Sequence, residues 1–306
     1  MCRETGNSET MFQICHDGRS ECAVKEENMI QDILPHHFYN QYHPEEKLSG
    51  DSFIISISPE GVLLHVNAKE RTLRYPRAEE FKSLGRTVYL FSIDEEKFFL
   101  DLCKEDTSVP AGYAYYNIRS IRDWDLQPRK YMMAAFTALQ LEEWYRKNRY
   151  CGECGQPTEI DTVERAMVCK SCRQKIYPRI NPAVIVGVKN GDKLLLTKYK
   201  TGFGSNALVA GFTEIGETFE ETVQREVMEE AGIKVKNIRY YKSQPWGIAS
   251  DILAGFYCEV DGDDTIHMDE SELKYAEWVQ REEIELQPVD YSLTNEMMLM
   301  FKEGKQ

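Results

Sequence analysis

Three glutamates at helical spacing are the first candidates for chemistry in this chain of 306 residues. At about 100° per residue, Glu226 shares a helix face with both Glu229 and Glu230. Like charges at this spacing destabilise a bare helix, and carboxylate oxygens are the ligands that hard divalent cations prefer. We therefore predict bound Mg²⁺ or Mn²⁺, ions that serve phosphate chemistry. The alternative is a solvated acidic helix face.

The residues around these glutamates are consistent with a positioned site. Arg225 precedes Glu229 by one turn and is expected to orient it. Gly211 and Gly216 permit a tight loop that leads into the helix, and Gly232 is expected to end it near the C-cap. The pattern thus predicts a glycine-bounded loop and helix that present carboxylates to one ligand.

Four cysteines form a second candidate site. Cys151-x2-Cys154 and Cys169-x2-Cys172 are separated by fourteen residues, a spacing typical of one tetrahedral structural Zn²⁺ per chain. Disulfides are the alternative, and the reducing interior of a cell disfavours them. The remaining cysteines follow no ligand pattern: Cys2, Cys15, Cys22, Cys103 and Cys258.

Length and composition set the frame that must hold these sites. At 42% hydrophobic and 29% charged residues, the chain is an ordinary globular protein of about two domains or more. We expect a disordered tail over 1–28, an N-terminal α/β domain over 29–148, the cysteine module over 149–178 and a further domain over 179–306. No repeat period or low-complexity tract interrupts them.

Hydrophobic patterning predicts the elements within these domains. In the first we expect strands at Phe53–Ile57, Val62–Val66 and Thr87–Phe91 and a helix over 129–147, with Trp124 and Trp144 in the core. In the last, helices are expected over Thr218–Ala231 and Thr294–Lys302. The strands expected there are Ala183–Lys189, Lys193–Thr197, Leu208–Gly211, Ile233–Ser243, Ile252–Val260 and Tyr275–Val279. This mixture indicates an α/β sandwich.

Charge and hydropathy exclude some classes of function. With 37 basic and 51 acidic residues the net charge is −14, which argues against wrapping long nucleic acid. One island, 146–179, holds eight basic and four acidic residues and could meet a phosphate or simply be solvated. No apolar stretch approaches the ~20 residues of a membrane span, and the first thirty residues carry no secretory signal. We expect a soluble cytoplasmic protein with no membrane partner.

Residues 211–233 fill every fixed position of G-x5-E-x7-R-E-U-x-E-E-x-G-U, where U is a bulky aliphatic residue. This is the Nudix box, so the chain resembles a Nudix hydrolase. With the cysteine module and Ser243-Gln-Pro-Trp246, it resembles the NADH pyrophosphatase family. The resemblance implies a Nudix α/β/α sandwich preceded by a zinc ribbon and a smaller N-terminal α/β domain. It also implies hydrolysis of NAD(H) to nicotinamide mononucleotide and AMP, removal of NAD caps from RNA 5′ ends, and a homodimer.

The resemblance also assigns roles to single residues. Metal ligands would be the carbonyl of Ala210 and the carboxylates of Glu226, Glu230 and Glu272. Arg225, Glu226, Glu229 and Glu230 would form the catalytic group, with Glu229 or Glu230 as the base. Substrate contacts would come from Arg122, Tyr177, Gln244, Pro245, Trp246, Gly247, Ile248, Ala249 and Ser250.

The chain departs from the family pattern after Trp246. The family continues Pro-Phe-Pro-x-Ser, whereas this chain has Gly247-Ile-Ala-Ser250, one residue shorter and without the aromatic ring. Stacking on such a ring is worth ~1–3 kcal/mol per base. ADP-ribose, a dinucleoside polyphosphate or FAD is therefore the alternative substrate, and Pro245-Trp246 could merely pack the strand end. A third hypothesis is a zinc-ribbon nucleic-acid-binding protein with an inactive Nudix scaffold.

Overall fold

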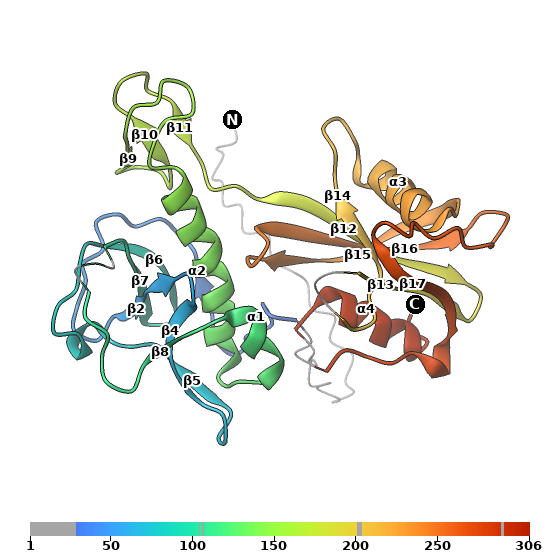
Figure 1. Ribbon diagram of the computed structural model, residues 1–306, viewed down its shortest axis with the longest axis horizontal. Helices are drawn as coiled ribbons and strands as arrows, with labels where there is room; N and C mark the ends of the chain where they lie inside the picture. The colour runs from blue at the N-terminus through green and yellow to red at the C-terminus, as the bar shows by residue number, and fades with distance from the viewer. Residues whose placement is uncertain (1–28, 104, 106, 201–203, 289–290) are drawn as a thin grey trace, which may run out of the picture.

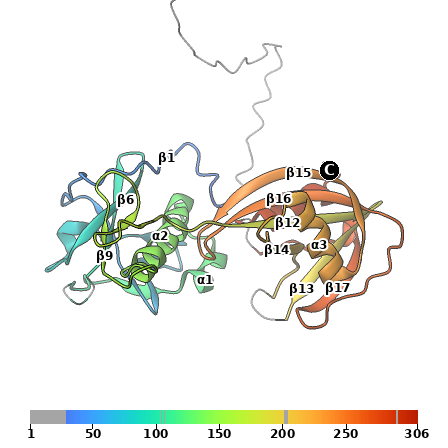
Figure 2. The ribbon, with the colours of Figure 1, turned by 90° about the horizontal axis from the view of Figure 1, so that it is seen from above.

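The computed structural model describes residues 29–306 except 104, 106, 201–203 and 289–290. The tail predicted over 1–28 lies outside the described residues. Figure 1 shows an N-terminal half, a small three-stranded module at the end of a long helix, and a C-terminal half. Figure 2 shows the two halves side by side, with strand β12 (Asn181–Asn190) continuing the chain from one to the other.

The N-terminal half contains two small four-stranded sheets and helix α2 (Arg129–Lys147), whose predicted bounds are confirmed. One sheet has the order β1-β6-β7-β2, and the other has β3-β4-β5 with β8 on β4. The strands are β1 (Phe38–Tyr39), β2 (Phe53–Ile55), β3 (Ile57–Ser58), β4 (Gly61–Asn67), β5 (Thr72–Arg74), β6 (Thr87–Ile93), β7 (Glu96–Asp101) and β8 (Ala114–Tyr116). The short helices are η1 (Ala78–Glu80), α1 (Ile118–Ile121) and η3 (Arg122–Trp124).

Two expectations for this half are corrected. The single strand predicted at Phe53–Ile57 is divided between the two sheets, because the chain changes sheet at Ser56. Ser56 is fully buried there and donates to a carboxylate oxygen of Asp101 at 3.1 Å. Trp144 is buried in the core as predicted, but Trp124 is 43% exposed at the end of η3.

The small module is an antiparallel sheet of β9 (Thr158–Ile160), β10 (Met167–Cys169) and β11 (Lys175–Ile176). It follows α2 directly, and Tyr42 of the N-terminal half donates to the carbonyl of Asp161 at 2.5 Å. Arg165 reaches from the module to the carbonyl of Leu90 in β6 at 2.7 Å. These contacts hold the module against the N-terminal half.

The C-terminal half is a six-stranded sheet between two helices, which confirms the predicted α/β/α sandwich. The sheet order is β15-β16-β12-β13-β17, with β14 on β12. Its elements are β12, β13 (Lys193–Tyr199), β14 (Val209–Phe212), α3 (Phe219–Ala231), β15 (Val235–Trp246), β16 (Asp251–Val260), β17 (Leu273–Gln280), η4 (Arg281–Glu283) and α4 (Leu293–Lys302). Apolar residues of α3 pack on one sheet face and those of α4 on the other.

Strand β15 begins two residues later than predicted and ends three residues later. The predicted strand ends at Ser243, two residues before Pro245, which cannot donate to a neighbouring strand. However, β15 lies at the edge of the sheet, where proline is tolerated, and the strand runs on to Trp246 opposite Asp251.

Helix α3 begins and ends where its local sequence directs. The side chain of Thr218 accepts a hydrogen bond from the backbone amide of Glu221. The side chain of Glu221 in turn accepts from the backbone amide of Thr218, and the two bonds form a capping box. Gly232 ends the helix with φ of 70°, a conformation that costs glycine little. Among the described residues, none of the helices combines the length and apolar character that a bilayer crossing requires.

The two halves meet where β15 turns into β16. Trp246 packs edge-on against Phe136 of α2, with ring centroids 5.1 Å apart. Gly247 lies so close to α2 that an added Cβ would stand 2.1 Å from the carbonyl oxygen of Phe136. Glycine is therefore required at this contact.

We expect Gly247→Ala to lower the free energy of unfolding by about 1–3 kcal/mol, because the methyl group must push α2 from the sheet edge. Thermal or denaturant unfolding would measure the change. Gly152→Ala is the matched control, since no atom lies within 4 Å of the position of its Cβ. Equal stability of the two variants would contradict the tight contact.

Candidate active site and zinc site

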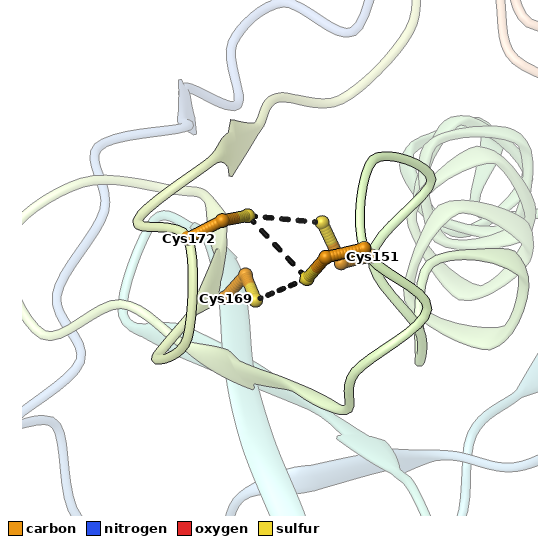
Figure 3. A group of neighbouring side chains, drawn as sticks. Cys151, Cys169 and Cys172 are labelled. Atoms are coloured by element: carbon orange, nitrogen blue, oxygen red, sulfur yellow. Dashed lines mark hydrogen bonds between the residues drawn. The ribbon is translucent and has the colours of Figure 1, made fainter.

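The four cysteines of the small module form one compact group. Their sulfur atoms all lie within 4.8 Å of one another, and three pairs stand at 3.4 to 3.5 Å (Figure 3). A tetrahedral Zn²⁺ with bonds of about 2.3 Å needs sulfurs roughly 3.8 Å apart. The donor set and its spacing therefore fit a structural zinc ion.

Each cysteine pair sits in the same kind of turn. Gly155 donates to the carbonyl of Cys151 at 2.9 Å, and Arg173 donates to the carbonyl of Cys169 at 2.9 Å. Gly155 and Arg173 both have positive φ, 71° and 67°. The backbone amide of Cys172 lowers the pKa of the Cys169 thiol to about 6, which favours the thiolate that zinc requires.

In the C-terminal half, Arg225 holds the acidic groups of α3 and its preceding loop in place. Its guanidinium donates to both oxygens of Glu217 at 2.6 and 2.9 Å, to Glu226 at 2.7 Å and to Glu229 at 3.0 Å. It also donates to the carbonyl of Phe212 in β14 at 2.9 Å. Arg225 lowers the pKa of Glu217 to about 2, so this carboxylate stays charged and fixes the guanidinium.

Glu230 is the most buried carboxylate of the group, at 3% exposure. Tyr199 donates its hydroxyl to one oxygen of Glu230 at 2.9 Å, while the other oxygen has no hydrogen-bond partner among the described residues. Burial, then the charges of Glu226 and Glu272, raises the pKa of Glu230 to about 8. A buried, unpaired carboxylate oxygen is a position that a cation would satisfy.

Glu226 lies against β14, beneath Gly211. A Cβ on Gly211 would stand 1.9 Å from the carboxyl carbon of Glu226, so only glycine leaves room for this side chain. Burial raises the pKa of Glu226, and the charges of Glu229 and Glu272 add to the effect. The structure thus brings Glu272, which lies before β17, into the electrostatic range of α3.

These atoms fit a divalent cation. The carbonyl of Ala210 lies beside Glu230, since the hydroxyl of Tyr199 reaches both, at 3.4 and 2.9 Å. The charges of Glu226 and Glu272 act on Glu230, so negative charge accumulates here, although the carboxylates do not converge as closely as the four cysteine sulfurs do.

We expect Arg225→Lys to lower kcat by about tenfold to a hundredfold, because an ammonium cannot span the three carboxylates that the guanidinium joins. Steady-state hydrolysis at saturating metal would measure it. Arg239→Lys, on the exposed side of β15, is the control. A wild-type kcat for Arg225→Lys would show that the network does not position the glutamates.

Two cavities reach strand β14, against which Glu226 lies. The smaller, about 300 Å³, lies between the halves and is lined by residues that include Arg119, Arg122, Tyr199, Ala210, Trp246, Ala249, Asp251, Leu253 and Tyr291. The larger, about 880 Å³, is lined by residues that include Trp144, Lys147, Tyr177, Arg179, Phe212, Glu214, Ala249 and Ser250. Ala210 and Phe212 of β14 line one cavity each, and Gly211 between them lies against the carboxyl group of Glu226.

The predicted substrate contacts divide between these cavities. Arg122 lines the smaller, where burial lowers its pKa and Asp123 lies 3.5 Å away. Tyr177 lines the larger, 54% exposed, with its hydroxyl 2.5 Å from Glu164. Trp246 lines the smaller cavity as well as packing on Phe136.

Residues 244–250 are held mainly by contacts within the protein. Gln244 is fully buried. Its side-chain NH₂ group donates to the carbonyl of Tyr291 at 2.8 Å, and its side-chain oxygen accepts from the backbone amide of Leu293 at 2.7 Å. Arg119 donates to the carbonyl of Ile248 at 2.6 Å. Further along, Pro245 is exposed, Gly247 is buried, Ile248 packs on the N-terminal core, and Ser250 donates to Glu143 at 3.4 Å. The N-terminal half thus orders the segment that lacks the family's prolines.

Four residues of this region were not among those predicted from the sequence. Glu217 carries a signal, because it is a fixed position of the motif. Tyr199, Arg119 and Asp251 carry none, since their partners lie far away in the sequence. Glu272 and Tyr177 were expected only through the family resemblance.

Comparison with known proteins places two segments in described families. A NUDIX domain model matches residues 179–297, and an NADH pyrophosphatase zinc ribbon model matches residues 146–177. NAD-capped RNA hydrolase NudC of Salmonella schwarzengrund is 39% identical over 174 residues, covering 56% of this chain and 67% of the relative. The namesake of Escherichia fergusonii is 41% identical over 165 residues, covering 54% and 63%.

NAD-capped RNA hydrolase NudC of Klebsiella pneumoniae is 40% identical over 174 residues, covering 56% of this chain and 66% of the relative. The matches therefore span about two thirds of the length of these curated relatives. A solved NUDIX hydrolase from Nitrosomonas europaea has a TM-score of 0.46 and 22% identity, covering 51% of this chain and 92% of the other.

Proposed function

The chain belongs to the Nudix hydrolases that carry an NADH pyrophosphatase zinc ribbon, and we propose that it cleaves the pyrophosphate bond of NAD(H) to nicotinamide mononucleotide and AMP. One observation carries the proposal. Glu230 is buried with one carboxylate oxygen unpaired among the described residues, and Tyr199, which donates to its other oxygen, lines the smaller cavity. Two cavities that reach β14, one at Ala210 and one at Phe212, suit a substrate with two nucleoside ends.

The proposed metal ligands are the carbonyl of Ala210 and the carboxylates of Glu226, Glu230 and Glu272. When bound there, Mg²⁺ or Mn²⁺ would neutralise charge on the pyrophosphate oxygens and lower the pKa of an attacking water. The protein's own residues prepare the site, because Arg225 fixes the carboxylates and Tyr199 orients Glu230. Glu229, whose side chain is 59% exposed, and Glu230 are the candidates for the base that takes the proton from water.

Product analysis tests the proposal directly. We expect chromatography after incubation with NADH and Mg²⁺ to show reduced nicotinamide mononucleotide and AMP. EDTA should abolish both products, and excess Mg²⁺ should restore them. If NADH survives intact while ADP-ribose, FAD or a dinucleoside polyphosphate is cleaved, the substrate proposal is wrong and the shortened segment after Trp246 is the first place to look. Inertness toward all of them would favour the scaffold hypothesis.

We extend the proposal to the NAD cap of RNA 5′ ends, because the relatives named above are NAD-capped RNA hydrolases. Lys147 and Arg179 line the larger cavity and could meet the phosphates that follow the cap. Release of a 5′-monophosphate RNA from an NAD-capped transcript would support this activity, and an uncleaved cap under conditions that hydrolyse NADH would refute it.

Two further properties belong to the same proposal. We propose a homodimer, as in the family it belongs to, which sedimentation or light scattering would test. Zinc held by four thiolates, and the free thiols of Cys103 and Cys258, suit a reducing compartment such as the cytoplasm.

A further inference from the structure

A buried carboxylate lies in the wall of the smaller cavity, away from the metal-binding glutamates. Asp251 is the first residue of β16 and is 6% exposed. In the sheet it lies between Asn181 of β12 and Trp246 of β15. Because side chains alternate along a strand, Asp251 shares its sheet face with Leu253, which also lines the cavity.

Asp251 has acceptor capacity that the protein does not use. Its side-chain hydrogen bond within the described part of the chain comes from the amide of Asn181 at 3.5 Å, at the outer limit of such bonds. An ionised carboxylate can accept about four hydrogen bonds. Burial raises the pKa of Asp251 to about 6, while Asn181 and the charge of Arg119 act in the opposite direction. A buried carboxylate with a single long hydrogen bond is stabilised strongly by a further hydrogen-bond donor.

The rest of the cavity is suited to a flat ring. Trp246, Leu253 and Tyr291 supply apolar and aromatic walls. Its volume of about 300 Å³ is at the small end of the range for ligand pockets, which suits one base with part of its sugar. Ala210 lines the same cavity and is a proposed metal ligand, so a ring there would belong to a substrate whose phosphates lie at the glutamates.

Arg119 forms its hydrogen bond with a backbone carbonyl and not with the carboxylate of Asp251. Its guanidinium donates to the carbonyl of Ile248 at 2.6 Å, and no ion pair joins it to Asp251 among the described residues. Other polar residues of the wall, among them Arg122 and Gln287, form no hydrogen bond with Asp251 within the described ranges, which leaves its carboxylate an acceptor within the cavity wall. The complementary ligand group is an N–H donor on the edge of a ring.

We propose that Asp251 accepts a hydrogen bond from an N–H group on one base of the bound dinucleotide and so determines which base the smaller cavity admits. The inference rests on the proposed function. Two groups of NAD have the required chemistry, the carboxamide of nicotinamide and the exocyclic amine of adenine. A carboxylate or keto oxygen in the same position would face the oxygens of Asp251 without a shared proton and would be rejected.

Two substrate analogues separate these sources. Nicotinic acid adenine dinucleotide replaces the carboxamide by a carboxylate, and nicotinamide hypoxanthine dinucleotide replaces the amine by a keto group and moves the donor to the ring N1–H. We expect wild-type kcat/KM to fall by about tenfold to a hundredfold for one of the two relative to NAD⁺. The analogue that is rejected identifies the base beside Asp251.

Asp251→Asn provides the decisive comparison, because asparagine keeps the size of the side chain and can donate to the analogue. We expect it to lower kcat/KM for NAD⁺ by about tenfold and to bring the ratio of the two substrates close to one. Asp192→Asn, in the exposed turn between β12 and β13, is the control and should keep the wild-type ratio. Thermal unfolding would verify that both variants are folded.

The outcomes are separable. Equal wild-type rates on NAD⁺ and both analogues, or an unchanged ratio in Asp251→Asn, would overturn the inference while leaving the proposed function standing. If no dinucleotide is hydrolysed, the proposed function fails, and calorimetric binding of the mononucleotides then tests Asp251 alone. Tighter binding of AMP than IMP, or of nicotinamide mononucleotide than its nicotinate analogue, that disappears in Asp251→Asn would support the inference; equal affinities would refute it.

Discussion

Glu230→Gln should reduce kcat for NADH hydrolysis by about a thousandfold or more, because a lost metal ligand removes several kcal/mol of transition-state stabilisation. Glutamine keeps the size of the side chain and can still accept from Tyr199, so the loss is one of charge. Steady-state kinetics at saturating Mg²⁺ would measure the effect, and Mn²⁺ titration would show weaker binding. Glu220→Gln, on the exposed first turn of α3, is the matched control.

Stability separates this effect from misfolding. The pKa of Glu230 rises from 4.5 to about 8 in the folded protein, so its charge destabilises the metal-free fold increasingly as the pH rises through that interval. Without metal, Glu230→Gln should therefore unfold at a higher temperature than the wild type at about pH 9, with little difference near pH 4.5. A kcat within tenfold of the wild type would contradict the assigned role.

Cys169→Ser is expected to abolish zinc binding and to unfold the small module. Cys169 is fully buried, and its thiolate is one of four converging ligands. Structural Zn²⁺ contributes about 10–16 kcal/mol to the folding of isolated zinc-finger peptides, far more than this three-stranded sheet could supply alone. Metal analysis should fall from one zinc per chain to none, and amide exchange should become fast in β9–β11.

The control for this variant is Cys103→Ser, a partly exposed thiol outside the cluster. It should keep one zinc per chain and wild-type exchange. Retention of stoichiometric zinc by Cys169→Ser would contradict four-cysteine coordination. Rapid exchange confined to β9–β11, with the C-terminal half still protected, would show that zinc stabilises the module and that the Nudix sandwich folds without it.

Local signals made the catalytic helix predictable. Thr218, Glu221 and Gly232 mark the ends of α3 within the sequence itself, and the observed helix differs from the predicted one by a single residue. The strands of the C-terminal half were found for a similar reason, because β12, β13 and β16 are long and strongly apolar. Long periodic segments bounded by turn residues specify their own structure.

The N-terminal half was predicted less well because its elements are short. Strands β1 and β3 have two residues each, and β2, β5 and β8 have three, too few to show a period. Their formation depends on pairing with distant strands, as in the parallel pair of β2 and β7. Such pairing is a property of the whole fold and leaves no local mark.

The residues of the site also fall into two groups, those with a local sequence signal and those without one. The acidic residues of α3 and the zinc cysteines are visible in the sequence because their spacing is fixed by a helix or a turn. The bond between Tyr199 and Glu230 joins β13 to α3, and that between Asn181 and Asp251 joins two parallel strands. These contacts appear only once the sheet is assembled.

Trp246 is partly buried and packs against the hydrophobic cores of both halves. The boundary between sequence motifs therefore does not separate independent folding units, since the wall of the smaller cavity is finished only when α2 is in place. We expect the two halves to melt in one calorimetric transition, whereas Gly247→Ala should split it in two. A fragment that begins at residue 179 would keep the glutamates and Asp251 but lose Arg119, Arg122 and the α2 residue against which Trp246 packs.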